Sequence, residues 1–352
     1  MRLNQFVKRF PTEESCVSYF KDIREPLLPV CPACGKHEYK WVENKCAFEC
    51  KACRYRLSLT TGTVMEHSKQ GISDWFYVMH LMTSIKQVLS AKEVQYQLGK
   101  KHYFPVWLMM MKLRSIMGKR EDEYKLHDEI ELDDAFFPTR TEKDYWYRQK
   151  SGVGSQQQTK VLVIVESKPV ENVIIAYGNN PENFSNGKFA KFAKKVERES
   201  IKKVVHYLKM IVVEDLKCKT VDDLMLRYVD PDSFVVTDGS TSFVNLEKHF
   251  KYHVSHVEGD NPDDVVKTYL PWVHVLMGEC RNGIMAIHKD VDKRFLQLYL
   301  NEYCWKFNRR RFRDSTNPTD DLFDRLVKIS ACYTSDMKWR NYPKIKSEGD
   351  EL

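Results

Sequence analysis

Apolar positions follow helical spacing over the first third of the chain, and strand-like apolar runs begin after about residue 128. Ser90-Ala-Lys-Glu93 is typical of a helix start, and Gly99 is typical of a helix end. The charged stretch 118–128 therefore predicts a linker between two parts of the chain. The helices expected before this linker span residues 15–23, 74–85, 90–98 and 106–117.

Beyond the linker, β-branched and aromatic runs alternate with amphipathic stretches. Three strands, a helix, a strand, a helix and a strand, followed by helices, form the element order of a ribonuclease-H-like core. The predicted fold class is α/β, a mixed sheet flanked by helices. The expected strands span 129–137, 160–166, 172–177, 208–213, 234–237 and 253–257. The expected helices span 187–203, 221–228 and 240–250, with mostly helical chain over 263–311.

The composition fits a globular protein rather than a disordered one, since 42% of the 352 residues are hydrophobic and 30% are charged. The longest apolar runs, 106–111 and 161–165, are far too short to span a bilayer. Residues 1–20 lack the apolar core of a secretion signal. We therefore expect a cytoplasmic protein that does not contact a membrane.

Ten cysteines in a chain of this kind point to metal binding more than to disulfides. Cys31-Pro-Ala-Cys34 and Cys50-Lys-Ala-Cys53 are separated by fifteen residues, so four thiolates can surround Zn²⁺ tetrahedrally. Such a site is structural, because four cysteines leave no open coordination position. The alternatives are a redox pair or free thiols, with Cys46 as a spare sulfur.

The three helices of 74–117, with Gly99 in a turn, have the order of a helix-turn-helix. Lys112 and Arg114 on the last of them are candidate DNA contacts. The same helix carries Met109, Met110 and Met111, so part of it must be core. A plain helical bundle is therefore the alternative to a DNA-binding segment.

The stretch 129–137 has the composition of a strand but carries acidic residues within it, and a second strand, 234–237, ends at Asp238. In a ribonuclease-H-like sheet these strands are neighbours, so Asp133 and Asp238 face each other at its carboxyl edge. At about 4 Å two carboxylates repel by roughly 4 kcal/mol at an effective dielectric near 20. Mg²⁺ or Mn²⁺ between them relieves that repulsion. The alternative is an exposed edge strand with solvated acids.

Side-chain parity favours Asp133 over Asp134 only slightly, because both faces of a central strand are covered. Asp134 shares its face with Ile130 and Leu132, and Asp133 shares its face with Glu131. The residue pattern leaves the third carboxylate open. The candidates are Glu258, Asp260, Asp263, Asp264, Glu279, Asp290 and Glu302.

Positive charge is concentrated in two places. Residues 140–210 contain 14 Lys and Arg against seven Asp and Glu, and the whole chain carries a net charge of +7. A second basic run, 306–313, is interleaved with phenylalanines. Such surface is typical of nucleic-acid binders, although solvated lysine-rich faces look the same. The expected phosphate contacts are Lys191, Lys194, Lys195, Arg309 and Arg310.

These motifs, taken in order, resemble the insertion-sequence transposases with an ISXO2-like domain. The resemblance is carried by the cysteine ribbon followed by Thr61-Gly-Thr63, the helix-turn-helix, and Glu131-Leu-Asp133-Asp134-Ala-Phe. Later pieces agree, including Val236-Thr-Asp238-Gly239, Pro271-Trp-Val-His274 and the stretch 296–310. The resemblance runs from about residue 10 to 312.

The resemblance implies a DDE-type transposase that cuts and joins DNA at the terminal inverted repeats of its element, as a homo-oligomer on DNA. The family's first two aspartates fall on Asp133 and Asp238. Many relatives have Ser-Asn-x-Lys where this chain has Gly278-Glu279-Cys280-Arg281. Glu279 then completes a DDE set, and Arg281, where a lysine is frequent, is a further expected DNA contact. The alternatives are a catalytically inactive DNA-binding regulator derived from a transposase, or an unrelated zinc-ribbon nuclease.

The resulting domain prediction has five parts. They are a helical lead-in (1–27), a zinc ribbon (28–65), a helix-turn-helix-like segment (66–120), a ribonuclease-H-like catalytic domain (121–315), and a C-terminal helical segment with a tail (316–352).

Overall fold

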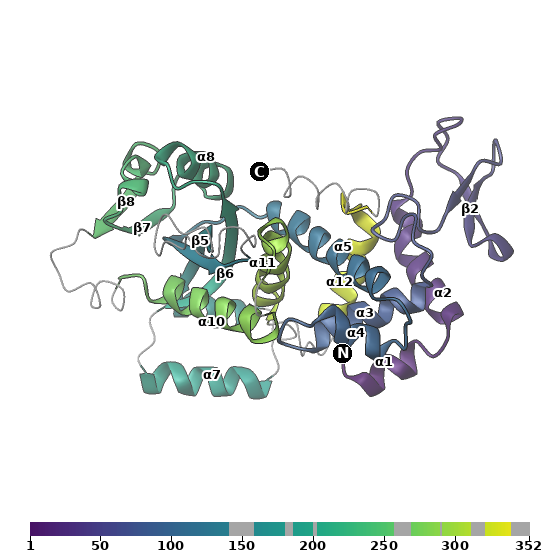
Figure 1. Cartoon of the computed structure of the whole chain (residues 1–352), viewed down its shortest axis with the longest axis horizontal. Coiled ribbons are helices and arrows are strands. Elements are labelled where there is room, and N and C mark those ends of the chain that lie inside the picture. Colours follow the sequence, from purple (N-terminus) through teal and green to yellow (C-terminus); the bar gives the residue numbers. More distant parts are fainter. Residues whose placement is uncertain are drawn as a thin grey trace. The chain divides into compact units, whose positions relative to one another are not determined.

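The computed structural model describes residues 1–140, 158–179, 186–199, 203–256, 269–288, 291–310 and 321–338 (Figure 1). The chain forms two compact units. Unit 1 contains Met1–Lys119 together with Pro318–Leu352, and unit 2 contains Arg120–Asn317. None of the helices in the described ranges is both long and apolar enough to cross a membrane.

Unit 1 is helical apart from a small three-stranded sheet. Its sheet has the order β1-β2-β3 and is antiparallel throughout. Its strands are β1 (Tyr39–Val42), β2 (Ala47–Cys50) and β3 (Arg56–Ser58). Its helices are α1 (Leu3–Arg9), α2 (Glu13–Arg24), α3 (Ile72–Ser84), α4 (Ala91–Gln97), α12 (Leu322–Cys332) and most of α5 (Tyr103–Asp122). Ser90 caps α4 as predicted, since its hydroxyl oxygen accepts a hydrogen bond from Glu93 N (3.1 Å).

The end of the chain returns to unit 1 and completes its core. The ring of Phe323 on α12 packs edge-on against Phe6 of α1 and Phe76 of α3, with centroid distances of 5.5 Å in both pairs. The buried carboxylate of Asp324 binds Arg9 (2.9 Å) and Tyr19 (2.6 Å). The described part of the segment expected at 316–352 therefore belongs to the helical core of unit 1.

The charged stretch 118–128 is not a linker over its whole length, because α5 continues to Asp122. The reason lies in unit 2. Glu121 is buried and accepts hydrogen bonds from Asn308 (2.5 Å) and Arg309, and Asp122 accepts one from Tyr228 (3.0 Å). These contacts satisfy charged side chains that would otherwise favour an exposed loop.

Unit 2 is built on a five-stranded mixed sheet in the order β6-β5-β4-β7-β8. β5 is antiparallel to both β4 and β6, whereas β7 runs parallel to β4 and β8 runs parallel to β7. This is the ribonuclease-H-like arrangement predicted from the element order. The strands are β4 (Glu129–Pro138), β5 (Gln158–Pro169), β6 (Lys203–Val213), β7 (Phe234–Asp238) and β8 (Tyr252–His256).

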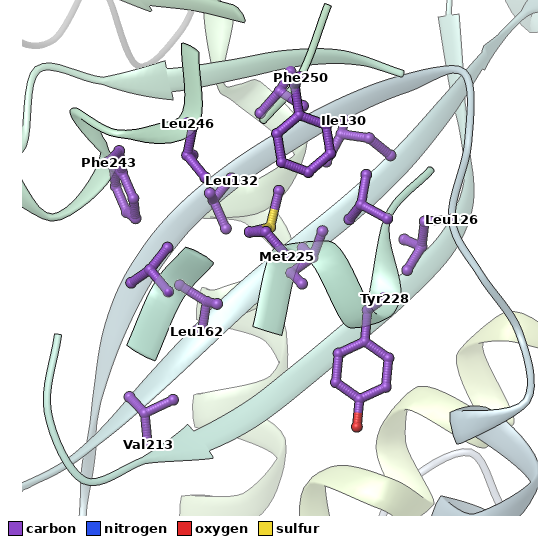
Figure 2. Packing of buried hydrophobic residues seen from close by; sticks show 14 of the residues in the cluster. Leu126, Ile130, Leu132, Leu162, Val213, Met225, Tyr228, Phe243, Leu246 and Phe250 are labelled. Atoms are coloured by element: carbon purple, nitrogen blue, oxygen red, sulfur yellow. The ribbon is translucent and has the colours of Figure 1, made fainter. Parts of the chain in front are cut away.

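Helices cover both faces of this sheet. On one face, Ile130 and Leu132 of β4 pack with Met225 of α8 (Cys218–Tyr228) in a buried apolar cluster (Figure 2). On the other face, α10 (Pro271–Ile287) contacts β4 and β5. α11 (Lys293–Asn308) lies along the outer edge of the sheet, where Gln297 and Asn308 bond to the backbone of β6. Alternate side chains of β4 therefore point toward α8 or toward α10.

Two predicted elements of unit 2 are wrong. The strand expected at 172–177 is part of helix α6 (Val170–Asn179), because both edges of β5 are already occupied by β4 and β6. The helix expected at 240–250 is a pair of short 3₁₀ turns, Thr241–Phe243 and Leu246–Lys248, which direct Phe243 and Leu246 into the apolar cluster. The basic helix α7 (Asn186–Glu199) lies where it was expected.

Candidate functional site

The four predicted zinc ligands converge in unit 1. Cys31, Cys34, Cys50 and Cys53 place their sulfurs within 4.8 Å of one another. Cys31 Sγ lies 3.5 Å from Cys53 Sγ, and Cys34 Sγ lies 3.6 Å from Cys50 Sγ. Sulfurs about 2.3 Å from a tetrahedral zinc lie about 3.8 Å apart, so this donor set fits Zn²⁺. Cys46 is not a member of the cluster.

Two equivalent turns present these thiols. In the first, Gly35 N donates to Cys31 O (2.8 Å), and in the second Arg54 N donates to Cys50 O (2.9 Å). Gly35 and Arg54 both have left-handed backbone conformations, with φ of 71° and 62°. Backbone N–H groups of Cys53 and Ala52 lower the pKa of Cys50 to about 7, which favours the thiolate that a metal binds.

The two predicted catalytic aspartates come together in unit 2. β4 and β7 run parallel, and their last paired residues are Leu132 and Thr237. Asp133, in the middle of β4, and Asp238, the last residue of β7, directly follow this pair, so they lie side by side where β7 ends, on the same face of the sheet. That face is the one covered by α10, and Asp134 points to the opposite face.

Helix α10 supplies groups to this edge. His274 Nε2 lies 3.1 Å from Asp133 Oδ2. Two residues back along β4, Glu131 Oε2 accepts hydrogen bonds from Trp272 N and Val273 N, both at 2.9 Å. Glu131 thus satisfies the free N–H groups at the start of α10 and fixes this helix against the aspartate strand.

The electrostatics of the edge disfavour two bare carboxylates. Burial, together with the charge of Asp238, raises the pKa of Asp133 to about 7. The same two causes raise the pKa of Asp134. Burial also raises the pKa of Glu131 to about 7 and lowers the pKa of His274. A site of this kind is stabilised by a cation, which is the environment that a divalent metal supplies.

Glu279, the third residue expected at this site, lies elsewhere. It lies five positions after His274 on α10, so the two side chains point about 140° apart around the helix axis. Glu279 is exposed, and the Tyr303 hydroxyl of α11 is 3.5 Å from its carboxylate. In the described ranges, Asp133, Asp238 and Glu279 do not form a group with all ligand atoms within 4.8 Å.

Among the other candidate third carboxylates, Glu302 is the one that lies within the described ranges. Glu302 is fully buried and pairs with Lys306 (3.0 Å), which gives it a structural role. The remaining candidates lie outside the described residues: Glu258, Asp260, Asp263, Asp264 and Asp290.

The two DNA contacts expected on the third helix point into unit 1. Arg114 is 1% exposed, and its guanidinium donates to Leu89 O (3.3 Å) and to Met111 Sδ (3.7 Å). Lys112 Nζ donates to Val64 O (3.3 Å) and Glu66 O (3.0 Å). Both cations therefore bond to groups of unit 1, and these bonds give them a structural role in place of the predicted DNA contacts.

Arg309 and Arg310 are likewise engaged within unit 2. Arg309 pairs with the buried Glu121 and stacks over Trp305 (4.9 Å). Arg310 Nη2 donates to Val205 O (2.6 Å), and its guanidinium lies 4.0 Å from the centre of the Phe307 ring. Both positions were expected to contact phosphates, but Arg309 joins the end of α11 to the end of α5, and Arg310 joins it to β6. The end of that basic run, 311–313, lies outside the described residues.

Three predicted lysines and one arginine remain accessible. Lys191, Lys194 and Lys195 are exposed on α7. Arg281 is half-buried on the same flank of α10 as His274, and its guanidinium lies 5.7 Å from the centre of the Phe137 ring. The cationic surface near the aspartates is therefore smaller than the sequence predicts.

His274 and Glu131 belong to this site, although neither was predicted as a functional residue. Two local features could have identified them. Glu131 precedes Asp133 by two residues, and therefore shares its strand face. His274 lies in the first turn of the helix that begins at Pro271.

Comparison with known families gives matches over both units. The model of a transposase zinc-ribbon domain matches residues 11–56, and the model of an ISXO2-like transposase domain matches residues 125–308. The second match covers more than half of the chain and includes both aspartates. No curated relative matches the sequence.

Proposed function

Because the chain belongs to the family of transposases with an ISXO2-like domain, we propose that it binds the terminal inverted repeats of an insertion sequence and catalyses metal-dependent DNA cleavage and strand transfer. The observation that carries this proposal is the pair of aspartates that lie side by side where β7 ends against the middle of β4. The test is cleavage of end-containing DNA by variants of these aspartates, with Mg²⁺ or Mn²⁺ present.

In this proposal Asp133 and Asp238 hold the catalytic metal. Divalent ions bound there supply activation of a water or a 3′-hydroxyl and stabilisation of the leaving oxygen in phosphoryl transfer. Glu131 keeps α10 in place by accepting hydrogen bonds from two backbone N–H groups at the start of this helix. Arg281, on the flank of α10 that faces the aspartates, is positioned to contact a phosphate.

The third ligand distinguishes two versions of the site. The family pattern favours Glu279 as this ligand, whereas the distance of 3.1 Å between His274 Nε2 and Asp133 Oδ2 favours His274. We expect His274→Ala to weaken Mn²⁺ binding about tenfold or more, as loss of a ligand or of its immediate partner does. Glu279→Gln should change this affinity less than about twofold. Electron paramagnetic resonance of free Mn²⁺ measures both.

The reverse order of effects would contradict the role of His274. It would mean that α10 turns to bring Glu279 to the aspartates when the metal binds. DNA cleavage by the same two variants provides a second readout, because removal of a metal ligand lowers cleavage as well as affinity.

The exposed lysines of α7 are proposed to contact DNA phosphates. Replacing Lys191, Lys194 and Lys195 by glutamine should weaken binding uniformly across sequences. The slope of log K against log salt should fall by about 0.9 for each phosphate that the variant no longer neutralises. Fluorescence anisotropy at several salt concentrations measures this slope. Lys112→Gln is the matched control, since its ammonium is bonded to backbone carbonyls, and it should lower stability without altering the slope.

A catalytically inactive DNA-binding regulator is the second candidate. The observation that favours it is the exposed position of Glu279, away from the aspartate pair. A regulator binds the element ends and does not cut them.

A transposase must hold two element ends at once, so we propose a homo-oligomer assembled on DNA for the active protein.

A further inference from the structure

A second group of metal-binding side chains lies at the amino end of β4. His127 and Asp128 directly precede this strand, and Glu166 extends from the neighbouring β5. One ligand atom from each of the three lies within 4.8 Å of the others. Asp133 is five residues further along, which corresponds to roughly 16 Å of strand. The group is therefore separate from the aspartate pair.

Glu166 gives this group a fixed centre. Its side chain is fully buried and accepts hydrogen bonds from His206 Nδ1 (2.5 Å), His127 N (3.1 Å) and Tyr124 OH (3.1 Å). These donors hold the carboxylate in one orientation. Ligand carboxylates in metal sites are oriented by hydrogen bonds of the same kind.

The group also already contains a cation. Lys168 Nζ lies 3.3 Å from Asp128 Oδ2 and 3.5 Å from Glu166 Oε1. The arrangement therefore places positive charge between the same two carboxylates that a metal would bridge. Lys168 is partly exposed on a flexible side chain, so it can leave toward solvent when an ion replaces it.

We propose that His127, Asp128 and Glu166 bind a divalent transition-metal ion in exchange for the Lys168 ammonium. One imidazole and two carboxylates suit Zn²⁺ and Mn²⁺, whereas Mg²⁺ prefers oxygen ligands and water. His206 and Tyr124 position Glu166 and are not ligands. The bound ion ties the segment that leaves α5, residues 123–128, to β5 of the sheet.

The half-exposed positions of His127 and Asp128 give the ion direct access from solvent. Binding of the ion is thus reversible, and the ion competes with the Lys168 ammonium for the two carboxylates. We expect the order of affinity Zn²⁺ above Mn²⁺ above Mg²⁺, which follows from the imidazole ligand and the Irving–Williams series.

The test uses the full chain with its cysteine zinc site loaded and with Asp133→Asn and Asp238→Asn introduced, so that the proposed catalytic pair holds no ion. Mn²⁺ is titrated and free Mn²⁺ is measured by electron paramagnetic resonance. We expect one bound Mn²⁺ per chain, displaced by Zn²⁺. His127→Ala and Asp128→Asn should each weaken binding about tenfold or more. These side chains are exposed, and circular dichroism checks that both variants remain folded.

Lys168→Gln provides the decisive comparison. If the ammonium competes with the metal, this variant should bind Mn²⁺ several-fold more tightly than the parent. If the group is only an ion-pair network, no Mn²⁺ binds in the parent or in Lys168→Gln, and the proposal is overturned. Binding that His127→Ala and Asp128→Asn leave unchanged would overturn it as well. None of these outcomes depends on whether the protein cuts DNA.

Discussion

Asp238→Asn is expected to lower Mg²⁺-dependent cleavage of end-containing DNA by about a thousandfold or more. The substitution preserves the shape of the side chain but removes the charge that holds the metal. Loss of about 4 kcal/mol of transition-state stabilisation corresponds to a thousandfold in rate. Asp133→Asn should have an effect of the same size, because in the proposed site both carboxylates hold the same metal. Single-turnover cleavage of a labelled duplex measures both rates.

Asp134→Asn is the matched control, because this neighbour lies on the opposite face of β4. It should reduce cleavage less than about tenfold, since a residue outside the metal site contributes only through the local field. DNA binding measured on all three variants separates loss of chemistry from loss of affinity. A large loss in Asp134→Asn with little loss in Asp133→Asn would exchange the roles of the two residues. Binding without any cutting by the unaltered chain would favour the regulator.

Removal of zinc should unfold the small sheet of unit 1. Four thiolates on Zn²⁺ contribute on the order of 10 kcal/mol to the folding of such a module, which is more than three short strands supply alone. A chelator or Cys50→Ser should therefore abolish amide-exchange protection in residues 31–58. The sheet of unit 2 should keep its protection, because none of the four cysteines belongs to it.

Cys46→Ser is the control for zinc loss. Cys46 is exposed and outside the four-sulfur group, so this variant should retain one zinc per chain and the same protection. Zinc content is measured by a colorimetric chelator after denaturation. Strands β1–β3 that stay protected after the zinc is stripped would contradict a structural role for the metal.

Local patterns in the sequence were sufficient for the features whose geometry depends on nearby residues. The spacing of Cys31, Cys34, Cys50 and Cys53 specifies two tight turns, and two such turns bring four sulfurs together. The element order predicted the ribonuclease-H-like sheet. Once that sheet order holds, the register of β4 against β7 brings Asp133 beside Asp238 at the end of β7.

Residues whose roles depend on distant partners were placed only by the tertiary structure. In the sequence, Arg114 does not differ from an exposed helical cation. In the structure it is buried and donates a hydrogen bond to Leu89 O. Glu279 has a suitable side chain, but the rotation of α10 against β4 presents His274 to Asp133 instead. Likewise, α12 joins unit 1 through packing with Phe6 and Phe76, more than 200 residues away in the sequence.

The amino-acid sequence by itself determined the zinc-binding turns, most of the strands and the strand positions of the two aspartates, because short-range spacing and strand alternation fix them. The third strand of the sheet was decided by tertiary packing, since β6 takes the place beside β5 and the segment 172–177 is helical. Tertiary packing decided which flank of α10 faces the aspartates. It also decided that Arg114 is a buried cation and not a DNA contact. The physical reason is that burial and partner distance set the free energy of a charged side chain, and both arise from residues far away in the chain.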